Sequence, residues 1–204
     1  MTKQGSIEET KRNQILKAAE EVFAQKGFFK ATIEEIAEQA QIAKGTVYLY
    51  FPDKPSIFIN LLAKKLNETK MRLLEIKAET LSSEEKLRKI FDYLSKTLFK
   101  PKYAQLFQTH SEKVITLTNN IMSEFKEKVT PQLKEIIKII AEIINQGIKD
   151  REFKKFDPKL LTLLFISTIR SLSLRKFYPL NYHYSANALK ELFFEILKPR
   201  GKND

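Results

Sequence analysis

Apolar residues recur at intervals of three and four along almost the whole chain, which is the period of a helix that buries one face. Residues 160–172 are apolar on nearly every side, which predicts burial on more than one face. No segment is convincing as a strand, and five Gly and seven Pro are few for a turn-rich β-sandwich. We therefore expect an all-α fold of about nine helices.

Short helices are expected near the N-terminus. Thr32, followed three residues later by Glu35, has the spacing of a capping box and predicts a helix over 33–39. A four-residue break over 40–43 separates this helix from a third one over 44–50. With the preceding amphipathic helix, these segments form a three-helix unit of the helix-turn-helix type.

A long helix connects this unit to the rest of the chain. Asp53 can cap a helix over about 54–78, because its carboxylate can accept from free first-turn N–H groups. We place a domain boundary there and expect a helix-turn-helix domain over 1–55 and a larger helical bundle over 56–204. Later helices are predicted to begin near Ser82 or Ser83, Pro131, Pro158 and residue 184.

The helix over 44–50 opens with residues that suit contact with DNA bases. Lys44 can donate to guanine O6 and N7, and Gly45 lets the backbone approach the duplex closely. Thr46 can hydrogen-bond to a base or touch a thymine methyl group. Tyr48 and Tyr50 carry hydroxyls that can reach phosphates. This pattern favours a recognition helix in the major groove.

Residues 12–58 resemble the DNA-binding domain of the TetR family of regulators. The residues that carry the resemblance are Arg12, Ile15, Leu16, Ala19, Phe23, Gly27, Thr32, Ile36, Ala37, Ala40, the run from Lys44 to Phe51, Asp53 and Lys54. Gln41 stands where the family usually has Gly, and Pro55 stands where it often has Glu. Neither departure touches the expected DNA-facing surface.

The resemblance implies how DNA is contacted. Contacts with the phosphate backbone fall on Thr32, Tyr48, Tyr50 and Lys54, and contacts with base edges fall on Ala43, Lys44, Gly45 and Thr46. Capping or packing alone is the alternative for Thr32 and Tyr48, and Leu49 is expected to pack. The partner is double-stranded operator DNA.

The resemblance also implies a homodimer, since such a reader binds palindromic half-sites. The last two helices, about 158–176 and 184–198, are the expected interface. The nominated residues are Leu161, Phe165, Leu189, Phe193 and Leu197. Each of these could instead belong to the core of the single chain.

A small-molecule effector pocket is implied among the middle helices, and their Phe and Ile content hints at a lipophilic effector. Arg170 could meet an anionic head group, pair with a carboxylate or reach solvent, and His110 could be an ordinary surface or core histidine. The nominated pocket residues are Phe91, Leu94, Tyr103, Phe107, His110, Phe125, Ile137, Ile144 and Arg170.

Composition narrows the function. The net charge of +11 suggests an acidic partner, either nucleic acid or an anionic membrane surface. Residues 1–56 carry eight Lys/Arg and eight Asp/Glu, so the excess lies outside the expected DNA reader. There is no cysteine, and there are two histidines, so thiolate and histidine-rich metal sites are excluded. No catalytic motif, catalytic residue, metal site or cofactor is expected, and the chain is predicted not to be an enzyme.

We expect a cytoplasmic, ligand-responsive transcription regulator. Repression, with release from a palindromic operator by the effector, is the family default. The N-terminus lacks the apolar core of a signal peptide, and the longest apolar run, over 160–169, is about half of what spans a bilayer. The alternative is a basic helical adaptor, or a protein that binds anionic membranes without specific DNA recognition.

Overall fold

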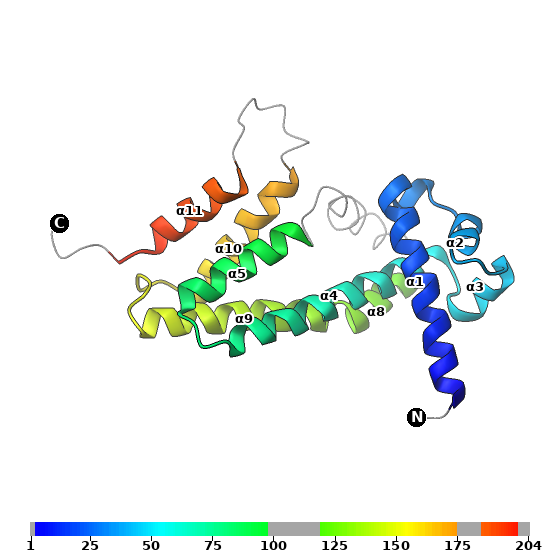
Figure 1. The fold of residues 1–204 in the computed structure, drawn as a ribbon, viewed down its shortest axis with the longest axis horizontal. Helices are drawn as coiled ribbons and strands as arrows, with labels where there is room; N and C mark the ends of the chain where they lie inside the picture. Colours follow the sequence, from blue (N-terminus) through cyan, green and yellow to red (C-terminus); the bar gives the residue numbers. More distant parts are fainter. Residues whose placement is uncertain (1–2, 98–118, 175–184, 200–204) are drawn as a thin grey trace. The chain divides into compact units, whose positions relative to one another are not determined.

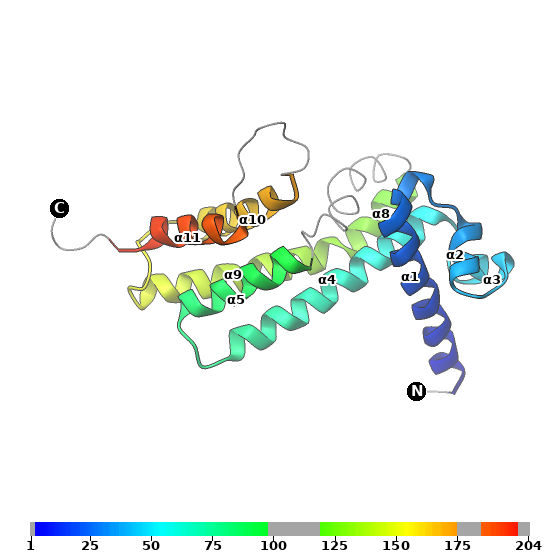
Figure 2. The same cartoon turned by 45° about the horizontal axis from the view of Figure 1, so that its top comes forward.

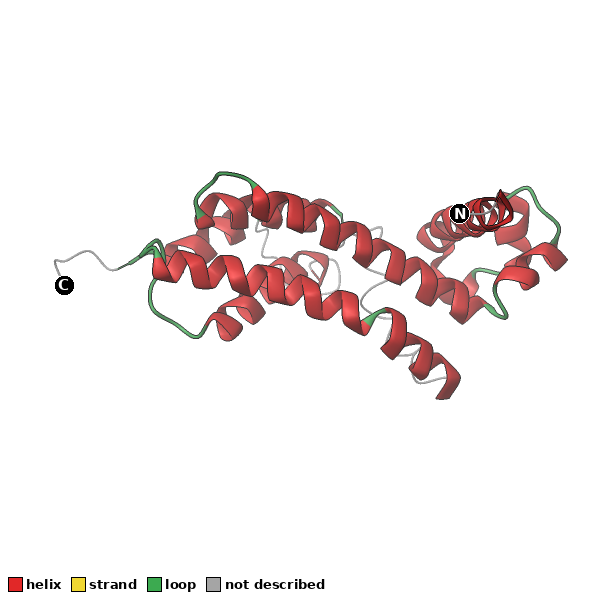
Figure 3. Ribbon diagram, turned by 90° about the horizontal axis from the view of Figure 1, so that it is seen from below, coloured by secondary structure: helices red, strands yellow, loops and turns green. Residues whose placement is uncertain are grey.

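The structure is a computed structural model that describes residues 3–97, 119–174 and 185–199, and all of the regular structure in these ranges is helical (Figure 3). The all-α prediction is confirmed. None of the described helices is both long and apolar enough to cross a membrane. The helices are α1 (Lys3–Lys30), α2 (Ile33–Gln39), α3 (Lys44–Tyr50), α4 (Lys54–Ala78), α5 (Ser83–Lys96), α8 (Asn119–Lys128), α9 (Thr130–Lys149), α10 (Pro158–Leu174) and α11 (Ala186–Leu197).

Local chemistry sets several of these boundaries. The capping box at Thr32 begins α2 as predicted, and Ser82 forms a second capping box with Glu85 that begins α5. The Asp53 carboxylate accepts from the backbone N–H of Ser56 at 2.7 Å, at the start of α4. Helix α1 leaves helical geometry at Gly27 (φ 77°, ψ 161°) and continues to Lys30.

The chain forms two compact units, which divide α4 after Leu66 and α9 after Gln132. The first unit holds α1, α2, α3, the first part of α4 and α8, and the second holds the remaining helices. The domain boundary between residues 55 and 56 stays a prediction.

The first unit is built on the buried face of α1 (Figure 1). Ile15, Ala19 and Phe23 are fully buried, as the helical period predicts. The Phe58 ring of α4 packs edge-on against Phe23 and Phe28, with ring centroids 6.0 and 5.2 Å apart. This packing holds α1 against the first part of α4, and α2 and α3 lie between these two helices in the chain.

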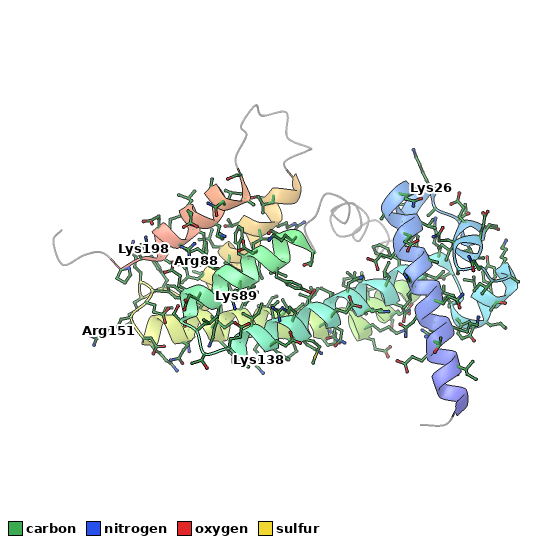
Figure 4. All side chains as sticks on the ribbon, in the orientation of Figure 1. Lys26, Arg88, Lys89, Lys138, Arg151 and Lys198 are labelled. Atoms are coloured by element: carbon green, nitrogen blue, oxygen red, sulfur yellow. The ribbon has the colours of Figure 1, made fainter. Side chains whose placement is uncertain are left out.

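The second unit has an aromatic core where α5, α10 and α11 meet (Figure 2). The Phe165 ring lies 6.0 Å from Phe91 and 5.1 Å from Phe193, between ring centroids. The Arg88 guanidinium of α5 lies 4.2 Å from the centre of the Phe194 ring and forms an ion pair with the Glu191 carboxylate of α11 (Figure 4). The periodicity of α5 and α11 is therefore explained by one shared core.

Candidate functional site

The turn between α2 and α3 has the geometry expected of a helix-turn-helix. Gln41 adopts φ 54°, in the left-handed region where Gly is preferred, and its backbone N–H donates to Glu38 at 2.9 Å. The N–H of Ile42 donates to Ala37 O at 3.0 Å. A non-Gly residue in this conformation costs about 1 kcal/mol, which the turn hydrogen bonds offset.

Helix α3 has a buried face and an exposed face. Val47 and the C-capping residue Phe51 are buried and hold the helix on its domain. The exposed face carries Lys44, Gly45, Tyr48 and Leu49, and Ala43 just before it is also exposed. Thr46 and Tyr50 are half-buried. Most of the residues predicted to contact DNA therefore share one accessible surface.

Leu49 does not pack as expected, because its side chain is 82% exposed. It lies beside Tyr48, which is 46% exposed, on the same turn of α3. Leu49 therefore contributes little to the core of the single chain.

Lys44 forms an ion pair within the domain. Its Nζ forms an ion pair with the Glu34 carboxylate of α2, and both side chains remain about half exposed. The hydrogen bond from Lys44 lowers the pKa of Glu34, and the same bond raises the pKa of Lys44. Contact between Lys44 and DNA would therefore require it to share or exchange this partner.

Thr32 caps α2, as its alternative explanation supposed. Its hydroxyl accepts from the Glu35 N–H at 3.2 Å, and its own N–H donates to the Glu35 carboxylate at 3.1 Å. The pKa of Glu35 is lowered, first by a hydrogen bond from Lys26 and then by this backbone bond. The Thr32 side chain remains exposed, so capping leaves it accessible.

Lys54 is held by the end of α1. Its Nζ donates to the carbonyls of Ala31 at 2.7 Å and Phe29 at 3.3 Å, and it lies 4.7 Å from the centre of the Phe28 ring. Burial lowers the pKa of Lys54. The side chain therefore caps orphan carbonyls at a helix end, a role that the sequence analysis did not assign.

Arg12 is a structural residue that the sequence analysis recorded only as part of the family resemblance. Its guanidinium donates to Tyr50 O at 3.0 Å and to Asn60 Oδ1 at 3.3 Å, and it lies 4.6 Å from the centre of the Phe51 ring. Arg12 therefore ties α1 and α4 to the C-terminal end of α3.

Asn60 continues this contact to α8. Its amide donates to the Glu124 carboxylate at 2.8 Å, and Lys128 donates to its carbonyl oxygen at 3.1 Å. The sequence signal was present, because Ser56 and Asn60 are polar residues four apart within an apolar stretch.

The nominated effector-pocket residues are divided between the two units and the part of the chain outside the described residues. Phe91, Leu94 and Ile144 are buried in the second unit, whereas the half-buried Phe125 belongs to the first. Ile137 and Arg170 have exposed side chains, so the structure contradicts their placement on a buried pocket wall. The remaining three, Tyr103, Phe107 and His110, lie outside the described residues.

A surface pocket of about 320 Å³ lies elsewhere in the second unit. Its lining is mostly polar and includes Lys77, Lys86, Glu142 and Lys149. None of the nominated effector residues lines it. Such a lining does not suit an apolar ligand.

The nominated dimer residues are mostly core residues. Leu161, Phe165, Phe193 and Leu197 are buried within the single chain, and Leu189 is half-buried. A side chain that is already buried in its own core cannot also form the surface that meets a second chain. The alternative stated for these residues is therefore the better explanation. The exposed apolar side chains of the same two helices are Leu160, Leu163, Leu164, Leu192 and Ile196.

Comparison with known proteins gives these features a context. Residues 15–61 match the family described as bacterial regulatory proteins, tetR family. The fatty acid metabolism regulator protein of Bacillus subtilis (strain 168) is 32% identical over 159 residues, which cover 76% of this chain and 78% of that protein.

Solved structures agree in fold. The transcriptional regulator FadR from Bacillus subtilis, determined in complex with stearoyl-CoA, has a TM-score of 0.67 and 27% identity, covering 90% of this chain and 98% of that one. The fatty acid degradation regulator FadR from Bacillus halodurans has a TM-score of 0.69 and 23% identity, covering 91% and 93%, respectively. With the identity and coverage of the Bacillus subtilis relative, the helix-turn-helix and the matched residues lead to one assignment: the chain belongs to the TetR family and is a DNA-binding transcription regulator, not an enzyme.

Proposed function

We propose that this regulator is a cytoplasmic repressor that binds a palindromic operator as a homodimer and leaves it when a long-chain acyl-coenzyme A binds. The observation that carries the DNA-binding part is the exposed face of α3, on which Lys44, Gly45 and Tyr48 lie together. A helix that is buried on one side and offers cationic, small and hydroxyl-bearing groups on the other suits the major groove.

The contacts divide into two kinds. Lys44 and Thr46 read base edges, with Ala43 and Gly45 allowing close approach of the backbone. Tyr48, Tyr50 and Thr32 bind phosphates through their hydroxyls and fix the register of the reader. Lys54 supports these contacts indirectly, because its ammonium group is engaged with the carbonyls that end α1.

The dimer forms through the exposed apolar side chains of α10 and α11. Leu160, Leu163 and Leu164 on α10 and Leu192 and Ile196 on α11 are each 43% or more exposed. A set of large apolar side chains on two neighbouring helices is what an interface between identical subunits uses. Pairing of the two helices with those of a second copy would bury the set and would bring two α3 helices to one operator.

The effector assignment rests on the likeness to regulators of fatty acid metabolism, one of which was solved with stearoyl-CoA. A long acyl chain needs an apolar site. We place it in the second unit against Phe91, Leu94 and Ile144, which are buried apolar side chains of α5 and α9. The acyl group binds the two conformational states with different affinities, and release from DNA follows by linkage.

Selection of random duplex DNA on the purified protein at about 150 mM salt tests the proposal, since salt strongly affects such binding. Tyr48→Ala is the control. We expect a palindromic consensus that the variant fails to select, and release of that DNA by stearoyl-CoA. Binding without a consensus, equal in the variant, would overturn the reading of α3. A consensus that stearoyl-CoA does not release would overturn the effector class alone.

A further inference from the structure

A continuous chain of polar contacts joins α8 to the end of the recognition helix within the first unit. The Glu124 carboxylate of α8 accepts from Asn60 of α4, Asn60 accepts from Arg12 of α1, and Arg12 donates to the carbonyl of Tyr50 in α3. These contacts join residues that are 38 to 64 positions apart in the sequence. No contact used for DNA recognition or effector binding requires them.

Asn60 is the branching point, and its chemistry fixes its orientation. Arg12 and Lys128 can only donate hydrogen bonds, so both must meet the amide oxygen of Asn60, at 3.3 and 3.1 Å. The Glu124 carboxylate can only accept, so it must meet the amide nitrogen, at 2.8 Å. The same amide nitrogen also donates to the Ser56 carbonyl of α4 at 2.8 Å, so Glu124 is the acceptor through which α8, rather than α4 itself, holds the amide with its oxygen toward Arg12.

Glu124 is itself held at one oxygen. Ser56 donates to Oε1 at 3.1 Å and Lys128 donates to it at 2.9 Å, in addition to Asn60. The Ser56 side chain is buried, so it has little alternative partner in water. A shift of α8 relative to α4 must break or rearrange this set as a whole.

The chain connects α8 directly to the second unit. Only Val129 separates α8 from α9, and α9 leads into the second unit, where Ile140 and Ile144 are fully buried. At the other end, Arg12 donates to the carbonyl of Tyr50 in the last turn of α3, where helix carbonyls have no N–H partner within the helix. The contacts thus begin on a helix that runs directly into the second unit, where we place the effector, and end at the DNA-reading helix.

We propose that Asn60 is a positioning residue through which α8 controls the recognition helix, with Glu124 of α8 accepting from its amide nitrogen and Arg12 joining its amide oxygen to α3. This inference rests on the proposed release of operator DNA by an acyl-coenzyme A and identifies the route of that regulation. The coupling would be a rearrangement of hydrogen bonds between two discrete arrangements.

Asn60→Asp tests the route with little change in shape. The aspartate can still accept from Arg12 and Lys128, but it cannot donate to Glu124, and it places two carboxylates against each other. Asn13→Asp is the matched control, because Asn13 also joins α1 to α4, accepting from Lys64 at 2.7 Å, but has no contact with α8 in the hydrogen bonds described.

The measured quantity is the ratio of operator dissociation constants with and without stearoyl-CoA. A ratio of roughly 5–150 is typical of such coupling and is expected for the wild type and for Asn13→Asp. Asn60→Asp should reduce this ratio to about one, whatever its affinity for the operator alone. Glu124→Ala, which removes the acceptor from the other side, should do the same, and Glu124→Gln should retain most of the ratio.

Hydrogen exchange in the absence of DNA and effector tests the route even if stearoyl-CoA proves to be the wrong effector. Glu124→Ala should speed exchange of the Phe51 N–H, which donates to Val47 O at the end of α3, and Asn13→Asp should not. If stearoyl-CoA does not change the operator dissociation constant of the wild type, the proposed effector class is refuted. Hydrogen exchange at Phe51 then decides whether the route from α8 to α3 exists. A wild-type ratio retained in both Asn60→Asp and Glu124→Ala, or unchanged exchange at Phe51, would overturn the inference.

Discussion

Two residues on α10 separate the core from the proposed dimer surface. Phe165 is fully buried and its ring contacts the rings of Phe91 and Phe193, whereas Leu163, two positions earlier, is 57% exposed. Replacing each by alanine should therefore affect two different equilibria. Phe165→Ala should weaken folding, and Leu163→Ala should weaken association.

The expected magnitudes follow from the burial. Removing a fully buried phenylalanine costs about 3–5 kcal/mol of unfolding free energy through lost transfer and the cavity left behind. Covering the exposed part of Leu163 in a dimer is worth about 1–1.5 kcal/mol, roughly half of the value for complete burial of a leucine. A twofold symmetric interface loses this on both chains, so the dimer dissociation constant should rise about 30–150-fold.

Sedimentation velocity over a range of protein concentrations measures the dissociation constant, and urea unfolding at a fixed concentration measures stability. Phe165→Ala should shift the unfolding midpoint at every concentration. Leu163→Ala should shift it only where the wild type is dimeric and the variant is not. If Leu163→Ala left dissociation unchanged, or if Phe165→Ala changed dissociation without lowering stability, the assignment of the two faces would be refuted.

Three further predictions follow from local geometry. Thr32→Ala should lower the unfolding free energy by about 1 kcal/mol through loss of the cap, measured by urea unfolding, with Thr32→Ser as the control that keeps the hydroxyl. Gly147→Ala should destabilise the protein by about 1–3 kcal/mol or more, because the new Cβ would lie 2.3 Å from a ring carbon of the buried Phe153; a normal melting temperature would contradict this packing. The hydrogen bond from Lys44 lowers the pKa of Glu34, so the stabilisation from this pair is present at neutral pH and is lost as the pH falls through that lowered value. An NMR titration should give a higher pKa for Glu34 in Lys44→Gln, and the same variant should bind the operator about 5–150-fold more weakly.

Helix boundaries could be predicted because local chemistry sets them. The spans 33–39, 44–50 and 54–78 match α2, α3 and α4, since a capping box, a four-residue turn and a capping aspartate mark their ends. These signals act between residues a few positions apart, which a sequence displays directly. Gln41, which stands where the TetR family usually has Gly, adopts the left-handed conformation that Gly favours.

The direction that each apolar residue faces could not be predicted so well. Helix α10 is apolar all round, so its period alone could not distinguish Leu161, which is buried, from Leu160, which is 65% exposed. That choice depends on where α5 and α11 pack, and these helices are distant in sequence. The same limit explains Leu49, whose apolar character favoured packing although no neighbouring helix covers it among the described residues.

The neutral charge of residues 1–56 is consistent with DNA binding because most of the acidic groups serve internal contacts. Glu20 pairs with Lys65 at 2.8 Å, and Glu35 closes the cap of α2 and pairs with Lys26. Glu34 of α2 is also paired, with Lys44 at the start of α3. Specificity in such a reader depends on which groups α3 exposes, while the net charge mainly sets the nonspecific, salt-dependent part of binding. The position of the basic excess along the chain therefore carries no information about which helix reads the operator.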